Sequence, residues 1–263
     1  MSSTTHVLQR RIRTRGYELD QDGLIPPATF LRYMEQLRWA SMEGDSPLEL
    51  GRIFRPGERY FVVAAQRLQV ERDVGVGATL CGELTIGRVG RTSLEFRHLF
   101  RLAAGEETVA RGSVAAVLLG EDARPTPLVG VVRQQALDLS QQGWSDGGSL
   151  DTLDPPVDDD AAGSFRHDIA VRPSDMDLLR HANHASYLAY ADDTRLLCAA
   201  AGGYGDAAAS GRLRGASLEY RREARAGQTL LARTWVIDHA PLTLAVVLSC
   251  SGEPVCRCAL RTA

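Results

Sequence analysis

The chain contains an internal repeat, which constrains its fold more than any other feature because each copy must bury the same apolar pattern. At an offset of 157 residues, a strand-like run that leads into a helix-like segment occurs twice. The aligned pairs are Asp20 with Asp177, Phe30 with Tyr187, Tyr33 with Tyr190, Glu35 with Asp192, and Arg38 with Arg195. The repeat predicts two similar folded units within the 263 residues.

Two later stretches of each half agree in the same order. At an offset of 150 residues, RLQVERDVGVGATL aligns with SLEYRREARAGQTL, and farther on GEETVARG aligns with SGEPVCRC. The aligned pairs are Arg72 with Arg222, Asp73 with Glu223, Gly77 with Gly227, Leu80 with Leu230, Glu107 with Glu253, and Arg111 with Arg257. Three stretches in one order indicate a duplication rather than a chance match.

Each half is expected to form one helix followed by several strands. The helices are expected over residues 27–42 and 184–200. In the second, Tyr187, Tyr190, Ala191 and Thr194 follow the i, i+3, i+4, i+7 spacing of one helix face. Residues 242–249 alternate in the period of two that is typical of a strand.

Composition narrows the class of protein. Hydrophobic residues make up 44% of the chain and charged residues 24%, which is ordinary for a folded globular protein. A formal net charge of -3 disfavours a nucleic-acid binder. No apolar run approaches the roughly 20 residues of a membrane-spanning helix, and the first residues lack the apolar core of a secretory signal. We therefore expect a cytoplasmic protein with no membrane or nucleic-acid partner.

A polar linker is expected between the halves, over residues 133–163, because Gly, Ser, Asp and Pro dominate there. Its acidic run, residues 158–160, is interpreted as solvated rather than metal-binding. The five cysteines lack the paired spacing of a zinc site, and Cys256 and Cys258 are expected to be buried in a strand. No metal and no cofactor are expected.

Three segments carry a resemblance to a known family. RIRTRGYELDQDGLIPPATFLRYMEQLRWAS resembles the opening of acyl-ACP thioesterases, in which an R-x-Y-E-x-D run leads into the first central helix. DMDLLRHANHASYLAYADDTR is similar to the D-x-D-x-x-x-H-x-N-x-x-x-Y signature of the hotdog thioesterase superfamily. LEYRREARAG is similar to the Y-R-R-E stretch of the acyl-ACP thioesterases.

The resemblance implies an α+β double hotdog fold, in which a long central helix is wrapped by an antiparallel sheet in each of two tandem domains. The expected boundaries are residues 1–132 for the N-terminal domain, 133–163 for the linker and 164–263 for the C-terminal domain. Because Leu24 stands where the second copy has His181, only the C-terminal domain is expected to hold an active site.

The resemblance also implies the site residues. The catalytic positions fall on Asp177, His181 and Glu223, and we expect substrate contacts from Asn183, Tyr187 and Arg222. The chain departs from the family at two places: Leu179 stands where an Asn is common, and Ala224 where a Cys is often found. The second departure excludes a thiol nucleophile at that position.

Thioester hydrolysis needs an activated water, donors for the oxyanion and a route for the leaving thiolate. We expect Glu223 to be the general base and His181 a donor or proton carrier, with Asp177 orienting His181 or binding the water. Backbone N–H groups over residues 181–185, at the start of the second helix, are expected to stabilise the oxyanion. Simpler roles stay open: Asp177 as a turn cap, Glu223 in a surface ion pair, and Tyr187 in the core.

The predicted function is hydrolysis of a fatty or polyketide-like acyl thioester of acyl carrier protein or CoA. The alternatives are a hotdog dehydratase or cyclase that acts on a carrier-bound chain, and a non-catalytic acyl-binding protein. Five arginines form a basic cluster that suits an acidic carrier protein: Arg212, Arg214, Arg221, Arg222 and Arg225. Two copies in one chain make a monomer feasible, and a homodimer is the other expected state.

Overall fold

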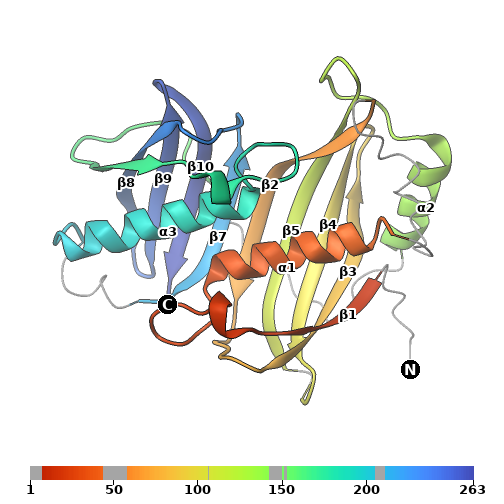
Figure 1. The fold of residues 1–263 in the computed structure, drawn as a ribbon, viewed down its shortest axis with the longest axis horizontal. Helices are drawn as coiled ribbons and strands as arrows, with labels where there is room; N and C mark the ends of the chain where they lie inside the picture. Colours follow the sequence, from red (N-terminus) through yellow and green to blue (C-terminus); the bar gives the residue numbers. More distant parts are fainter. Residues whose placement is uncertain (1–7, 44–57, 106, 142–149, 151–152, 205–210) are drawn as a thin grey trace. The chain divides into compact units, whose positions relative to one another are not determined.

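The structure is a computed structural model that describes residues 8–43, 58–105, 107–141, 150, 153–204 and 211–263. Its contacts divide the chain into two compact units. The N-terminal unit comprises Met1–Ala64 and Glu71–Leu150, and the C-terminal unit comprises Ala65–Val70 and Asp151–Ala263. Both are α+β, with one long helix against an antiparallel sheet, as predicted (Figure 1).

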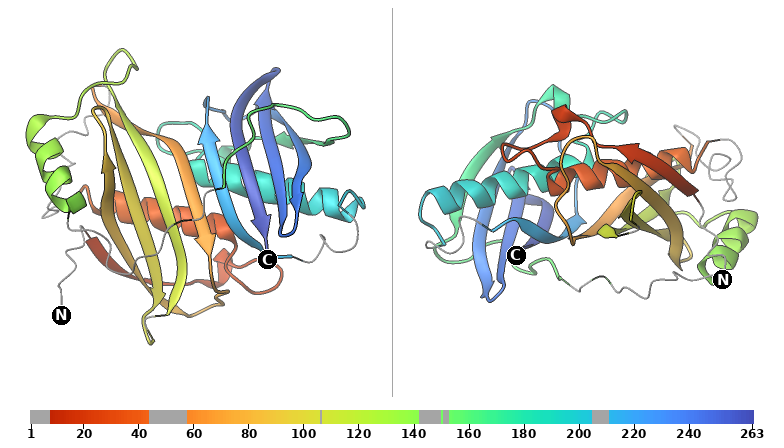
Figure 2. Two further views of the ribbon diagram at one scale, coloured as in Figure 1. Left: turned by 180° about the vertical axis from the view of Figure 1, so that it is seen from behind. Right: turned by 90° about the horizontal axis from the view of Figure 1, so that it is seen from below.

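The N-terminal unit has strands in the order β1-β3-β4-β5-β2. They are β1 (Leu8–Arg13), β2 (Tyr60–Val70), β3 (Thr79–Val89), β4 (Ser93–Leu102) and β5 (Thr108–Leu119), with a short 3-10 turn, η1 (Gly16–Glu18), after β1. Helix α1 (Pro27–Ala40) lies on one face of this sheet, which Figure 2 shows from behind. Gly82 of β3 permits that approach, because a Cβ there would lie 3.1 Å from Leu37 Cδ1 of the helix.

The C-terminal unit has strands in the order β7-β10-β9-β8-β6. They are β6 (Phe165–Ala170), β7 (Leu213–Tyr220), β8 (Thr229–His239), β9 (Leu242–Cys250) and β10 (Glu253–Thr262). Residues 65–69 of β2 pair antiparallel with β7, so this unit takes one strand segment from the first half of the chain. Helix α3 (His184–Ala200) spans the predicted residues, follows the short 3-10 turn η3 (Pro173–Asp175), and crosses the sheet.

The repeat is visible in the backbone hydrogen bonds of each unit. Three backbone hydrogen bonds between the chain before the helix and the turn before the next strand recur with the predicted alignment. In the first copy the bonds are Thr14 N to Ala78 O, Gly77 N to Thr14 O, and Ile25 N to Val74 O. In the second they are Val171 N to Gln228 O, Gly227 N to Val171 O, and Ala182 N to Ala224 O. The duplicated architecture is therefore reproduced bond by bond around the helix starts.

The region between the halves differs from the expected linker. Helix α2 (Gly130–Gln141) occupies its first part and packs against β3, burying Val132, Ala136 and Leu139. These three residues follow the i, i+4, i+7 spacing of one helix face, and their burial against the sheet stabilises a helix in a stretch that is otherwise largely polar. The QQGWSDGGS stretch lies, apart from its first residue, outside the described residues.

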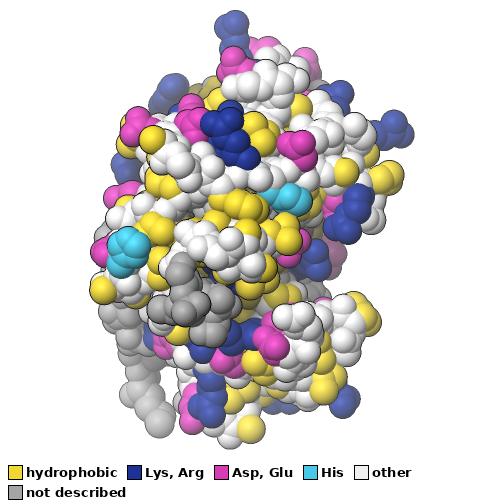
Figure 3. All heavy atoms as spheres, turned by 90° about the vertical axis from the view of Figure 1, so that its left-hand side faces the viewer, with side chains coloured by type: hydrophobic (Ala, Val, Ile, Leu, Met, Phe, Trp, Pro, Cys, Tyr) yellow, Lys and Arg dark blue, Asp and Glu magenta, His cyan; other side chains and the backbone are white. Residues whose placement is uncertain are grey.

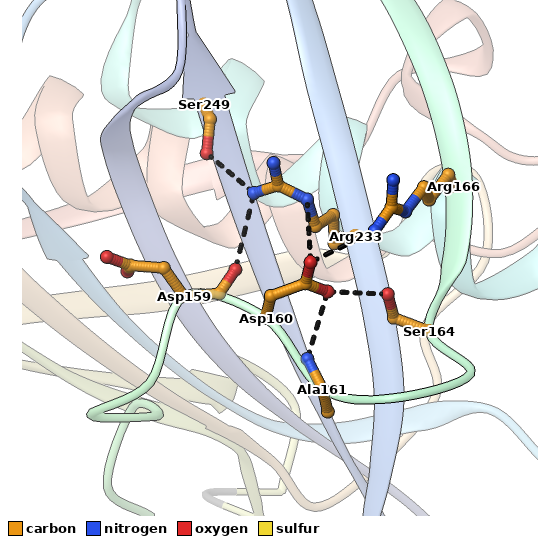
Figure 4. Close-up of polar contacts among 7 residues, drawn as sticks. All are labelled: Asp159, Asp160, Ala161, Ser164, Arg166, Arg233 and Ser249. Carbon is orange, nitrogen blue, oxygen red and sulfur yellow. Dashed lines mark hydrogen bonds and ion pairs between the residues drawn. The ribbon is translucent and has the colours of Figure 1, made fainter.

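Two carboxylates of the acidic run form surface ion pairs with arginines of the C-terminal unit. Asp159 Oδ1 accepts a hydrogen bond of 2.7 Å from Arg257 Nε. Asp160 forms an ion pair of 3.0 Å with Arg166 and one of 3.7 Å with Arg233, as Figure 4 shows. Both side chains remain solvent-exposed, Asp159 at 42% and Asp160 at 45%, so the ion pairs lie at the surface. Two of the three arginines are 73 and 98 residues away in sequence, which is why the sequence did not reveal these partners.

Three further observations concern membrane spans, metal sites and cysteines. Among the described residues, no helix has the length and apolar character needed to cross a membrane. Within the same residues, no cluster of three or more His, Cys, Asp or Glu could hold a metal ion. Cys256 and Cys258 are fully buried on β10, as the strand pattern predicted, and burial raises the pKa of the Cys256 thiol well above its ordinary value.

Candidate active site

The residues singled out in the second half meet at the start of α3. Asn183 is the N-cap: its Oδ1 accepts a hydrogen bond of 2.9 Å from Ala185 N. An Asn in this place satisfies a helix-start donor that would otherwise lack a partner. The turn over residues 175–183 precedes the helix, and the loop that contains Glu223 follows β7.

Asp177 shapes this turn through its carboxylate. Its Oδ1 accepts hydrogen bonds from Leu179 N at 2.8 Å and from His181 N at 3.2 Å. Asp20, its repeat counterpart, does the same for the backbone of Asp22 and Leu24, at 3.0 Å each. Because the first copy holds this turn without a histidine, the contact explains Asp177 as the residue that fixes the backbone of His181.

His181 and Glu223 are in direct contact. The His181 Nε2 atom lies 2.5 Å from Glu223 Oε2, with the side chains 30% and 47% exposed. The other carboxylate oxygen of Glu223 accepts a hydrogen bond of 2.6 Å from Arg225 Nη2. The site therefore presents a carboxylate–imidazole pair that is reachable from solvent.

The loop of Glu223 is joined to the helix start on both sides of Ala224. Ala182 N donates to Ala224 O at 2.7 Å, and Ala224 N donates to Tyr187 Oη at 3.0 Å. Tyr187 is buried, its ring lies 5.5 Å from that of Tyr220, and burial raises its pKa. Tyr187 is therefore part of the core, and its hydroxyl group holds the loop that carries Glu223.

Arg222 lies in an exposed ion pair with Glu253, 3.3 Å apart. Its repeat counterpart Arg72 pairs with Glu107 in the first copy. A contact that recurs in the copy without a histidine favours a structural interpretation of Arg222.

Carboxylates also neutralise other members of the basic cluster. Arg221 binds Glu219 at 2.8 Å, and Arg225 binds Glu223. On the face drawn in Figure 3, basic and acidic side chains of the described residues are interspersed rather than gathered by sign. The cluster that the sequence suggested for a carrier protein is thus largely paired within the chain.

Sequence reasoning missed the most heavily bonded carboxylate near the site, Asp175. It accepts hydrogen bonds from Tyr190 Oη at 2.7 Å and from Arg172 N, Nε and Nη2 at 2.9 to 3.1 Å. Burial opposes its ionisation, but the bonds from Arg172 and Tyr190 outweigh burial and hold the pKa of Asp175 below its ordinary value.

A signal for Asp175 was present in the repeat. Glu18 aligns with it at the offset of 157 and accepts hydrogen bonds of 2.8 Å from Arg15 N and from Tyr33 Oη. The aligned pair Tyr33 and Tyr190 was the signal, because in each copy the hydroxyl of this helix tyrosine donates a hydrogen bond to the carboxylate in the turn before the helix.

The backbone donors expected for an oxyanion are already engaged. The N–H groups of four of the five residues 181–185 bind acceptors within the chain: His181 with Asp177 Oδ1, Ala182 with Ala224 O, Asn183 with Asp175 O, and Ala185 with Asn183 Oδ1. This corrects the expectation, because the turn that positions His181 consumes those donors. Positive potential around this turn comes from the positive end of the α3 dipole and from the guanidinium group of Arg180, the residue before His181.

Comparisons with known proteins bear on the family and on the fold. Residues 171–260 match the family described as the thioesterase-like superfamily. Comparison with curated protein sequences finds no match.

Solved structures resemble the whole chain. A putative oleoyl thioesterase from Lactobacillus plantarum has a TM-score of 0.77 at 16% identity, covering 97% of this chain and 94% of that one. The 12:0-ACP thioesterase from Umbellularia californica has a TM-score of 0.74 at 21% identity, covering 97% and 93%. An acyl-ACP thioesterase from Bacteroides thetaiotaomicron has a TM-score of 0.75 at 13% identity, covering 97% of each. At these identities the likeness establishes the double hotdog fold.

Proposed function

We propose that this chain, whose C-terminal unit matches the thioesterase-like superfamily, hydrolyses an acyl thioester, fatty or polyketide-like, of acyl carrier protein or CoA. The observation that carries the proposal is the contact between His181 and Glu223 at the start of α3. The first copy has Leu24 in place of the histidine, so it serves as scaffold. The solved thioesterases with the same fold support this choice of reaction.

In the proposed reaction, a water molecule attacks the carbonyl carbon of the thioester. Glu223, as general base, takes one proton from that water, and His181 stabilises the oxyanion that forms. The tetrahedral intermediate then breaks its carbon–sulfur bond. The proton returns through His181 to the leaving sulfur, so that a carboxylic acid and a free thiol are the products.

The other site residues are assigned supporting roles. Asp177 is a positioning residue, since its carboxylate binds the backbone of His181. Asn183 caps α3, and Tyr187 braces the loop of Glu223. Direct contacts of Asn183, Tyr187 and Arg222 with substrate stay predictions, as do a cytoplasmic location and a monomeric or homodimeric state.

The test is release of free thiol from purified protein. Acyl-CoA and acyl-ACP of several chain lengths are incubated with the protein, and thiol is followed with a chromogenic reagent while the acyl group is analysed by mass spectrometry. Thiol release that depends on protein concentration supports the proposal. An altered acyl group without thiol release would identify a dehydratase or cyclase instead, and binding without any chemical change would identify an acyl-binding protein.

A further inference from the structure

The turn that carries His181 holds an arginine where its repeat counterpart is glycine. Arg180 has φ 62°, in the left-handed region, and Gly23 has φ 74° at the same place in the first copy. A side chain in this conformation costs about 1 kcal/mol relative to glycine. Backbone strain of this kind tends to persist where a side chain has a function.

The side chain of Arg180 is exposed and, among the described residues, has neither a hydrogen bond nor an ion pair. Nearby arginines differ, since Arg172, Arg222 and Arg225 each bind a carboxylate. Arg180 thus leaves an unmatched positive charge directly beside the proposed catalytic histidine.

Two exposed leucines precede it. Leu178 is 70% exposed and Leu179 is 40% exposed, which is high for large apolar side chains in one turn. The turn therefore presents two apolar residues, a cation and the imidazole in sequence order. The thioester substrates of the proposed reaction carry matching groups, because the thioester carbonyl lies at one end of a flexible arm that includes methyl and methylene groups and an anionic phosphate lies at the other end.

We infer that Arg180 binds the phosphate of the 4′-phosphopantetheine arm of the substrate, with Leu178 and Leu179 in contact with the arm. The inference rests on the proposed function, because CoA and acyl carrier proteins share this arm. The guanidinium group suits a phosphate through paired, charge-assisted hydrogen bonds. Arg180 is thus a specificity residue for the leaving group and takes no part in the bond-breaking step.

The experiment compares two thioesters with the same acyl group, acyl-4′-phosphopantetheine and acyl-pantetheine, which differ only in the phosphate. KM and kcat are measured for the wild type, Arg180→Gly and Arg180→Lys. Arg180→Gly is expected to raise KM about two- to fivefold for the phosphorylated substrate, as for loss of an exposed ion pair, and to leave KM for acyl-pantetheine unchanged. Arg180→Lys is expected to recover part of the loss.

Arg32→Ala is the matched control, because Arg32 is exposed on α1 and has no partner among the described residues. It is expected to leave both KM values unchanged. Acyl-CoA and acyl-ACP are then assayed with the same variants, and the larger rise in KM identifies which carrier presents its phosphate to Arg180.

An equal change in KM for both pantetheine substrates, or no change for either, would overturn the inference while leaving hydrolysis intact. If the wild type releases no thiol from any of these substrates, the proposed function itself fails. The two failures are therefore distinguishable.

Discussion

Asp177 and Asp20 hold the same turn in the two copies, each through two backbone N–H groups, although only the turn of Asp177 carries a histidine. Because the same two hydrogen bonds form in the copy without a histidine, the carboxylate has a role in holding the backbone that does not depend on any role in the reaction. A residue that acts through the position of another is tested by changing its charge and its shape separately.

Asp177→Asn keeps an acceptor oxygen and removes the charge, whereas Asp177→Ala removes both. If Asp177 positions His181, Asp177→Asn retains kcat within about fivefold, while Asp177→Ala lowers kcat strongly and stability by about 1 kcal/mol. Steady-state kinetics and urea unfolding measure both effects. The control Asp20→Ala is expected to cost similar stability without loss of activity. An Asp177→Asn variant as inactive as Asp177→Ala, with unchanged stability, would place the charge in the chemistry.

The left-handed backbone at Arg180 predicts a gain in stability. Arg180→Gly is expected to raise the free energy of unfolding by about 0.5 kcal/mol, because relief of the Cβ clash exceeds the added entropy of the unfolded chain. Arg180→Ala keeps the Cβ atom and is expected to give no gain. The midpoints of urea unfolding measure the difference. Equal stabilisation by both variants would show that the long side chain, and not the backbone angle, is responsible.

The lowered pKa of Asp175 predicts a pH dependence of stability with a defined sign. Since the folded state holds this carboxyl ionised to lower pH than the unfolded chain, its contribution is present above the unfolded pKa of about 3.9. That contribution is lost as pH falls through the folded pKa. Tyr190→Phe removes one of the bonds responsible, so it should flatten the rise of stability with pH below about pH 4.

The control for this measurement is Tyr187→Phe, because Tyr187 Oη accepts a hydrogen bond from a backbone N–H and, within the described part of the chain, contacts no carboxylate. Its stability–pH curve is expected to keep the wild-type slope in the same range. An unchanged slope in Tyr190→Phe would mean that Arg172 alone keeps Asp175 ionised.

The repeat and the helix periodicity predicted two units of one helix and several strands, including the bounds of α3, and the family resemblance implied the double hotdog fold that these units form. They could not predict α2, because its residues favour a helix only when Val132, Ala136 and Leu139 have a sheet to pack against. Nor could they predict the partners of Asp159 and Asp160, which depend on arginines brought close by the sheet.

For the site, the motif brought together His181 and Glu223, which lie 42 residues apart in sequence. It did not reveal that the backbone donors of the turn are used within the chain, because hydrogen bonds such as Ala182 N to Ala224 O join separate segments. Comparison of the two copies was the better guide to structural roles. Contacts that both copies make, as for Asp177 and Arg222, indicate structural roles. The residue that the first copy lacks, His181, is the one assigned to the reaction.

The decisive measurement is the rate of thiol release from acyl-CoA and acyl-ACP by the wild type, His181→Ala and Glu223→Ala, beside the control Asp73→Ala at the matching position of the first copy. We predict that each of the first two variants lowers kcat/KM by about 10²-fold or more, with unfolding midpoints unchanged, and that Asp73→Ala retains wild-type activity. Wild-type rates in both His181→Ala and Glu223→Ala would contradict the assignment of this pair as the catalytic centre.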